Sequence, residues 1–157
     1  MIQTAIMEIL VSILIAAVAA LIIKTAWSSM GLTLVVVEGA SMEPLFHSGD
    51  LVLVQHVPPQ DIHVGDIIVY QGCGGKLIIH RVYLICNNGG TYCYVTWGDN
   101  NPAPDTPNMI CSTCLCTLDG IYQAAVPYEK VVGKVVEAGG FIYKVPYIGA
   151  LASLLRS

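Results

Sequence analysis

An uninterrupted apolar run near the amino terminus constrains this chain most. Residues 9–23 read ILVSILIAAVAALII and contain no charged side chain. A helix rises about 1.5 Å per residue, and the hydrocarbon core of a bilayer is about 30 Å thick. Extending the run back to Ala5 gives a span of sufficient length, with Glu8 near one interface and Trp27 near the other. We therefore expect residues 1–27 to form an N-terminal transmembrane anchor.

A cleaved secretory signal is the alternative interpretation of this run, because small residues lie within it at positions 16, 17, 19 and 20. A secretory signal begins with a basic segment, whereas the first Lys or Arg of this chain is Lys24. This difference favours a retained anchor. The orientation is ambiguous, because Lys24 on the C-terminal flank would by the positive-inside rule place the bulk of the chain in the cytoplasm.

The cysteines favour the opposite orientation. All six lie in the segment from residue 73 to residue 116, namely Cys73, Cys86, Cys93, Cys111, Cys114 and Cys116. An even number of clustered cysteines is typical of disulfides formed in an oxidising compartment. A zinc site is one alternative, since the last three have ligand-like spacing, and reduced thiols are another. The disulfide interpretation places residues 28–157 on the extracytoplasmic side of the membrane.

Composition excludes two broad classes. Of 157 residues, 11% are charged, with 7 Lys and Arg against 11 Asp and Glu, and the net charge is −4. The mean hydropathy of +0.67 is too high for an intrinsically disordered chain. Seven scattered cations provide no basic stripe for a phosphate backbone, so we expect no nucleic-acid partner.

After residue 30 the pattern is typical of a mainly β domain, with short β-branched runs separated by turns. The expected strands are 32–37, 51–55, 67–70, 77–85, 91–97 and 131–137. Gly-Asp pairs at 49–50, 65–66 and 98–99 are typical of turns, in which the aspartate caps the turn. Residues 100–128 hold four prolines and are expected to be a long extended excursion. The apolar tail 146–157 is too short to span a membrane and is interpreted as membrane-associated, the alternative being a last piece of core.

Four blocks of the chain carry the candidate chemistry. Residues 38–54 include EGASMEP followed by FHSGDLVLV, and residues 65–70 read GDIIVY. Residues 78–82 read IIHRV, and residues 97–105 read WGDNNPAPD. In this order they resemble type I signal peptidases, the membrane-bound enzymes that remove signal peptides. The resemblance covers roughly residues 34–137, with the apolar run in the expected place.

The resemblance implies a signal-peptidase-like β-fold and a set of site residues. The bacterial branch of this family has a lysine base at the position held here by His80, so the chain resembles the branch found in archaea and in the endoplasmic reticulum. By resemblance Ser41 is the nucleophile, His80 the general base, Asp105 the orienting acid and Asp99 a second required carboxylate. Some members have a serine at the position of Gly39, so the oxyanion hole is expected to use backbone N–H groups, including that of Ser41.

The residue types are chemically consistent with these roles. A serine hydroxyl is a weak nucleophile unless a neighbouring base accepts its proton, and an imidazole does so near neutral pH. A carboxylate on the other ring nitrogen stabilises the imidazolium that forms. Taken singly, Ser41 would be an ordinary turn residue, His80 a core histidine, and Asp99 and Asp105 solvated turn formers. The assignment depends on their occurrence together in family order.

Further expectations concern partners and alternatives. Met42, Ile78 and Ile79 are expected to line the substrate site, and no cofactor or metal is implied. The implied substrates are secretory precursors cut after small residues in an Ala-x-Ala-like pattern, at a cell membrane or an endoplasmic-reticulum-type membrane crossed once. The sequence permits accessory subunits without requiring them. The alternatives are a self-cleaving peptidase of the repressor type, which uses lysine, and a membrane-tethered cysteine-rich binding module without catalysis.

Overall fold

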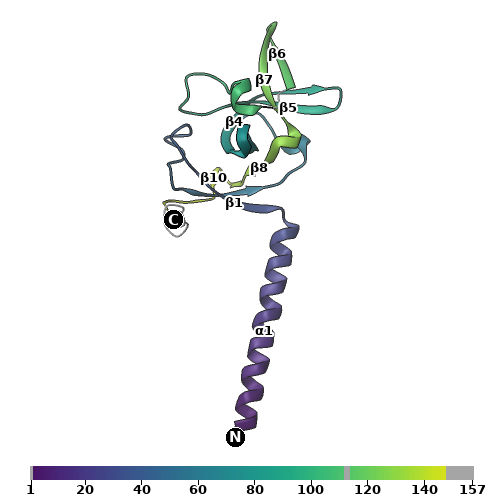
Figure 1. Cartoon of the computed structure of the whole chain (residues 1–157), viewed down its shortest axis with the longest axis vertical. Coiled ribbons are helices and arrows are strands. Elements are labelled where there is room, and N and C mark those ends of the chain that lie inside the picture. Colours follow the sequence, from purple (N-terminus) through teal and green to yellow (C-terminus); the bar gives the residue numbers. More distant parts are fainter. Residues whose placement is uncertain (1, 112–113, 148–157) are drawn as a thin grey trace. The chain divides into compact units, whose positions relative to one another are not determined.

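The computed structural model describes residues 2–111 and 114–147, and the chain divides into two compact units, Met1–Leu32 and Thr33–Ser157. In the first unit, helix α1 (Ile2–Ser29) contains an exposed 20-residue stretch, Ile6–Thr25, that is long and apolar enough to cross a membrane (Figure 1). The predicted helix is therefore confirmed. The expected interfacial position of the Trp27 side chain and the expected membrane contact of the tail at 148–157 lie outside the described residues.

The second unit is built on a large sheet. In the described residues it has nine strands in the order β1-β2-β8-β3-β4-β5-β7-β6, with β11 paired to β2. The strands are β1 (Leu32–Val36), β2 (Leu51–Gln55), β3 (Ile67–Gln71), β4 (Leu77–Asn88), β5 (Thr91–Trp97), β6 (Cys114–Leu118), β7 (Ile121–Pro127), β8 (Val131–Val135) and β11 (Lys144–Val145). A separate two-stranded ribbon joins β9 (Glu137–Ala138) to β10 (Phe141–Ile142). Short helical turns are η1 (Pro59–Asp61), η2 (Cys73–Gly75), α2 (Pro107–Ile110) and η3 (Tyr128–Lys130).

The mainly β prediction is confirmed, and each of the six expected strands is present with ends shifted by a few residues at most. The expectation for residues 100–128 is wrong in its second half, where β6 and β7 form an antiparallel hairpin. Three of the four prolines, Pro102, Pro104 and Pro107, lie before residue 108, and the fourth, Pro127, is the last residue of β7. The hairpin turn has positive φ at both Asp119 and Gly120, which is the Asp-Gly conformation that closes tight hairpins.

Strand β3 organises the core because it is buried on both faces. Ile67 and Val69 belong to one apolar cluster, which includes Val35 and Phe46. Ile68 and Tyr70 point to the opposite face and pack in a second cluster with Val82, Tyr94 and Val126. Successive side chains of a strand alternate between faces, so a run of four buried residues gives a strand with core on both sides.

All six cysteines are described residues, and they form three disulfides: Cys73–Cys111, Cys86–Cys116 and Cys93–Cys114. The three cysteines with zinc-like spacing therefore bond to three different partners. The second and third disulfides fasten β6 to β4 and β5, and the first joins η2 to the residue that follows α2.

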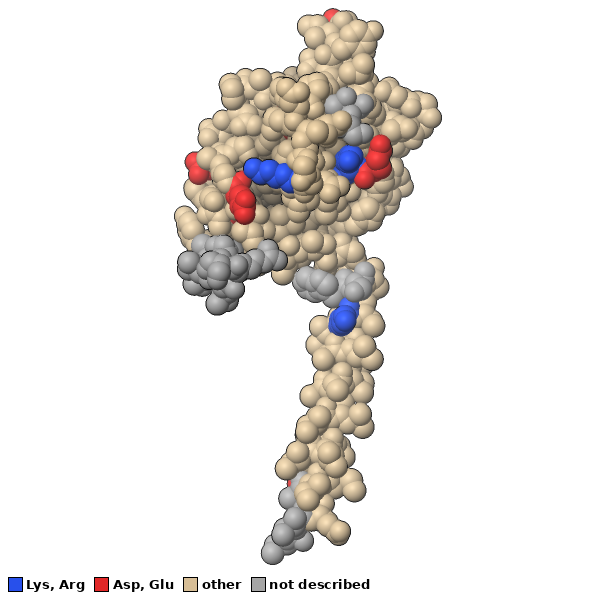
Figure 2. All heavy atoms as spheres, in the orientation of Figure 1, with Lys and Arg blue, Asp and Glu red and all other residues tan. Residues whose placement is uncertain are grey.

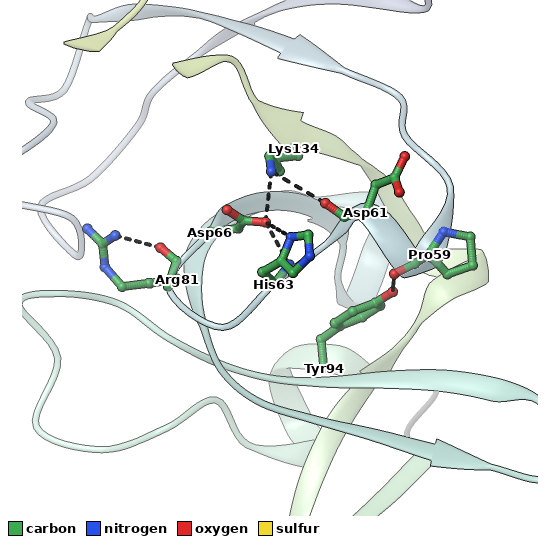
Figure 3. Close-up of polar contacts among 8 residues, drawn as sticks. Pro59, Asp61, His63, Asp66, Arg81, Tyr94 and Lys134 are labelled. Atoms are coloured by element: carbon green, nitrogen blue, oxygen red, sulfur yellow. Dashed lines mark hydrogen bonds and ion pairs between the residues drawn. The ribbon is translucent and has the colours of Figure 1, made fainter. Parts of the chain in front are cut away.

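Charged residues are sparse on the surface (Figure 2), and several contribute to turns. Asp50 Oδ2 accepts the backbone N–H of His47 at 3.0 Å, and Asp66 Oδ2 accepts that of His63 at 2.7 Å. These two Gly-Asp turns are capped as predicted. Asp66 also binds Lys134 Nζ at 2.9 Å, which connects the turn before β3 to β8 (Figure 3).

Candidate active site

The register of three adjacent strands brings three polar side chains to one face of the sheet. Ile68 of β3 lies opposite His80 of β4, and Val82 of β4 lies opposite Thr96 of β5. Paired residues, and residues two apart on one strand, point to the same face. Tyr70, two residues after Ile68, therefore shares a face with His80 and Thr96. This pairing explains how residues from three strands can converge on one point.

Asp105 reaches the side chains of Tyr70, His80 and Thr96 because the loop after β5 folds back onto that strand. The backbone N–H of Asp105 donates to Thr96 O at 2.9 Å, and that of Asn101 donates to Gly98 O at 2.9 Å. The indole N–H of Trp97 also donates to Asn101 O at 3.0 Å. Residues 97–105 therefore leave β5 and return beside it, which directs the Asp105 carboxylate into the protein.

A chain of hydrogen bonds connects three of the predicted site residues. His80 Nδ1 lies 2.7 Å from Asp105 Oδ2, and His80 Nε2 lies 3.0 Å from Ser41 Oγ. An ionised carboxylate can only accept, so Nδ1 is the donor to Asp105, and in the neutral ring Nε2 is then the acceptor that faces the serine hydroxyl. The side chains of His80 and Asp105 are 2% and 0% exposed, so this pair is shielded from water.

The loop that carries Ser41 is held against the turn after β5. Asn100 donates from its backbone N–H to Ser41 O at 2.8 Å and from its side chain to Ala40 O at 3.0 Å. Gly98 of the same turn lies very close to both Ser41 and His80. A Cβ at this position would lie 2.7 Å from Ser41 O and 2.8 Å from His80 Nε2. The glycine therefore permits the close approach of the serine loop to the histidine.

Two residues that the sequence analysis missed also contact Asp105. Tyr70 Oη donates to Asp105 Oδ2 at 2.7 Å, and Thr96 Oγ1 donates to the same oxygen at 2.6 Å. Burial, and then the adjacent Asp105 carboxylate, raise the pKa of the Tyr70 phenol. The available signal was a tyrosine in an otherwise apolar buried strand, since a buried phenol O–H needs a partner.

A groove of about 1040 Å³ opens at Ser41 and His80. One wall is residues 33–36 of β1, which lies at the end of the sheet order, and the other includes residues 76–80 at the start of β4. Two of the predicted substrate-site residues, Ile78 and Ile79, line it. Their position places an apolar wall directly before His80.

The structure places the other two predicted residues elsewhere. Met42 follows Ser41 but is 1% exposed and packs in the apolar cluster with Val35 and Phe46, so its expected place in the substrate site is corrected to the core. The turn at residues 42–46 directs this side chain inward, where burying an apolar thioether is favourable. Asp99 lies outside the hydrogen-bond chain and binds Arg81.

A serine hydroxyl, an imidazole and a buried carboxylate in hydrogen-bond sequence on a β scaffold define the class of serine-peptidase-type hydrolases. Comparison with known proteins agrees with this class. A sequence family described as Peptidase S24-like matches residues 16–93. The signal peptidase complex catalytic subunit SEC11 of Leptosphaeria maculans is 35% identical over 147 residues, covering 87% of this chain and 76% of that protein.

The human signal peptidase complex catalytic subunit SEC11C is 30% identical over 125 residues, covering 78% of this chain and 57% of that protein. The SEC11 protein of Scheffersomyces stipitis is 37% identical over 86 residues, covering 50% of this chain and 51% of that protein. The chain thus spans little more than half the length of the mammalian relatives that it matches. It belongs to the type I signal peptidase family, in the endoplasmic-reticulum and archaeal branch.

Proposed function

We propose that this protein is a membrane-bound serine endopeptidase that removes N-terminal signal peptides from secretory precursors. The observation that carries the proposal is a continuous chain of hydrogen bonds at a groove large enough for an extended peptide. Ser41 Oγ lies 3.0 Å from His80 Nε2, and His80 Nδ1 lies 2.7 Å from Asp105 Oδ2. Membership of the signal peptidase family supports the choice of substrate.

The proposed reaction uses each group at a stated atom. Ser41 Oγ attacks the scissile carbonyl carbon as its proton passes to His80 Nε2, and Asp105 stabilises the imidazolium that forms. The backbone N–H of Ser41 donates to the developing oxyanion, a contact worth roughly 3–4 kcal/mol. The C–N bond then breaks, His80 protonates the leaving amine, and water hydrolyses the acyl-enzyme by the same route.

The groove supports an extended substrate. Strand β1 is at the end of the sheet order, and Leu34 and Val36 on it are exposed. A peptide in β conformation can add to such an edge, which places alternate side chains in the groove. Ile78 and Ile79 form the wall beside the reacting bond and are proposed to favour small residues there, as in an Ala-x-Ala pattern.

We further propose that α1 is a single-pass anchor and that the catalytic unit lies on the extracytoplasmic side of a cell membrane or an endoplasmic-reticulum-type membrane. Three disulfides support an oxidising environment for this unit. Accessory subunits are compatible with the names of the relatives, which are subunits of a complex, but the proposed chemistry uses only this chain. Protease protection of the catalytic unit in sealed vesicles of known orientation tests the topology.

The experiment that tests the function uses the full chain purified in detergent. It is incubated with a precursor carrying an Ala-x-Ala signal peptide, and the product is mapped by mass spectrometry. We expect one cut after the second alanine with the wild type and none with Ser41→Ala or His80→Ala. Cleavage by Ser41→Ala at the wild-type rate, or no cleavage by the wild type with or without added accessory subunits, contradicts the proposal.

A further inference from the structure

Asp105 has an asymmetric set of contacts. Three donors converge on its Oδ2: His80 Nδ1 at 2.7 Å, Tyr70 Oη at 2.7 Å and Thr96 Oγ1 at 2.6 Å. Its other carboxylate oxygen, Oδ1, is buried and has no hydrogen-bond partner among the described residues. The orientation of the carboxylate is therefore set through one oxygen.

The two hydroxyl donors are buried as completely as the carboxylate. Tyr70 and Thr96 are both 0% exposed and come from β3 and β5, the strands on either side of the strand that carries His80. Water cannot readily replace either hydroxyl at such a site, so each contact depends on the side chain that supplies it. A charge-assisted hydrogen bond in this environment is also stronger than one between neutral groups.

We propose that Tyr70, with Thr96, is a positioning residue of the reaction, acting through Asp105. The proposal rests on the proposed function. The two hydroxyls hold the carboxylate so that Oδ2 faces His80, which directs Nε2 of the ring at Ser41. They also share the electron density of Oδ2 with His80, so the carboxylate stabilises the imidazolium less than an otherwise unpartnered carboxylate would.

The sharing of Oδ2 predicts in which direction the protonation of His80 changes when a donor is removed. A protonated imidazole is a stronger donor than a neutral one, so removing a competing donor from Oδ2 favours the protonated ring more than the neutral ring. Without the Tyr70 hydroxyl, His80 should hold its proton to a higher pH. The acid limb of kcat/KM should move in the same direction, because the base must be neutral to accept the proton of Ser41.

Other charged groups near His80 are the same in every variant proposed. Glu38 and Lys76 line the groove with it and are exposed. Arg81, which follows His80 on β4, and Asp99, in the turn after β5, bind each other. A difference between Tyr70→Phe and the wild type therefore reports the phenol hydroxyl.

Tyr94 provides a matched control. It is also 0% exposed and packs in the same apolar cluster as Tyr70, but its hydroxyl donates to the backbone oxygen of Pro59 at 2.9 Å (Figure 3). Tyr94→Phe removes a buried phenol hydroxyl of the same kind without touching Asp105. Any loss of activity through general destabilisation should therefore be common to both variants.

The experiment compares Tyr70→Phe, Tyr94→Phe and wild type as full chains in detergent. For Tyr70→Phe we expect kcat to fall about tenfold with KM unchanged, because the carboxylate, and through it the His80 ring, is held less precisely. We also expect the acid limb of kcat/KM to move to higher pH, whereas Tyr94→Phe should keep the wild-type values. Unchanged kcat and an unchanged limb in Tyr70→Phe, or the same changes in Tyr94→Phe, overturn the proposal.

Two additions keep the test decisive. The imidazole titration of His80, followed by NMR with nitrogen-15-labelled histidine, does not depend on cleavage of a precursor. An upward shift of its midpoint in Tyr70→Phe supports the positioning role even where the proposed substrate is not cut, and no shift overturns it. If Tyr70→Phe does not fold, the same titration is measured in two variants of Thr96. Thr96→Val is expected to move the midpoint of the His80 titration upward, and Thr96→Ser, which keeps the hydroxyl, is expected to keep the wild-type midpoint. Equal midpoints in these two variants overturn the proposal.

Discussion

Arg81 holds Asp99 by two hydrogen bonds, Nε to Oδ1 at 2.8 Å and Nη2 to Oδ2 at 2.6 Å. The third guanidinium nitrogen, Nη1, donates to the backbone oxygen of Gly65 at 2.8 Å. These contacts connect β4 to the turn after β5 and to the turn before β3, and the hydrogen bond with Asp99 raises the pKa of Arg81. Asp99 thus differs from the aspartates of the other two Gly-Asp turns, which cap their own turns.

Asp99→Asn is expected to retain most of its activity and to melt earlier. The pair is partly exposed, with side chains 37% and 24% accessible, so its loss should cost about 1 kcal/mol or less and lower Tm by about 2–4 °C. Thermal melts and kcat/KM measure both quantities. Adding Arg81→Ala to Asp99→Asn should cost less than the sum of the single changes. A stable and inactive Asp99→Asn would instead give this carboxylate a catalytic role.

Asp105→Asn is expected to lose about four orders of magnitude in kcat, which is the loss typical of a Ser-His-Asp protease whose orienting aspartate becomes an amide. An amide at this position can force the wrong tautomer on His80, which then presents N–H to Ser41. Stability should fall by only about 1–2 kcal/mol, because the amide oxygen can still accept from Tyr70 and Thr96. Single-turnover kinetics and urea unfolding measure the two effects, and full activity would remove Asp105 from the mechanism.

Gly98→Ala is expected to abolish most activity. The added Cβ would lie 2.7 Å from Ser41 O and 2.8 Å from His80 Nε2, so the serine loop or the ring must move. A displacement of about 1 Å at reacting groups can cost about 10²-fold in rate. Gly133→Ala is the control, since its Cβ would meet the backbone of Gln55 at 2.5 Å instead. Comparable kcat/KM in the two variants would show that the close approach at Gly98 is not needed for catalysis.

The stability of the fold should depend on the ionisation of Asp50. Burial of this 1%-exposed carboxylate by itself raises its pKa, but the His47 N–H and the Lys144 ammonium outweigh burial and hold the pKa below its ordinary value of 3.8. A group with a lowered pKa in the folded state stabilises the fold above the unfolded-chain value, and this contribution is lost as pH falls through the folded value. The wild type should therefore lose this contribution below about pH 4.

Asp50→Asn tests that dependence. It should unfold more easily by about 1–2 kcal/mol at pH 7, and its difference from the wild type should shrink as pH falls below 4. Urea titrations at a series of pH values measure this difference. Glu129→Gln, at an exposed position, should follow the wild type throughout. A difference between Asp50→Asn and wild type that stays constant down to pH 2 would contradict the prediction.

The disulfides should differ in their effect on activity. Replacing both cysteines of the 73–111 or the 93–114 disulfide by serine should cost about 2–4 kcal/mol of stability. Cys73 lines the groove, whereas Cys93 is buried in a separate cluster, so only the 73–111 change should raise KM. Thiol titration of unfolded, unreduced wild type should find no free thiol. Equal effects of the two double substitutions on KM would contradict the expectation that the 73–111 disulfide supports the substrate groove.

Local patterns were sufficient to predict much of this protein. A run of apolar residues predicts α1, and β-branched runs between turn residues predict strands, because both signals arise within a few neighbouring residues. The blocks that contain Ser41, His80 and Asp105 are also local, and the structure brings these residues into one hydrogen-bond chain. The β6–β7 hairpin was missed because prolines earlier in the same segment suggested irregular structure throughout.

What only the tertiary structure decided is which side chains meet. Tyr70 and Asp105 are 35 residues apart, and their contact depends on the register of β3, β4 and β5 and on the closure of the loop after β5. The side chain of Met42 packs in the core although its neighbour Ser41 faces the groove, since a turn sends consecutive side chains in different directions. Strand register follows from which face of each strand is buried against residues distant in sequence, and one strand's own pattern does not show which residues of its neighbours it will meet.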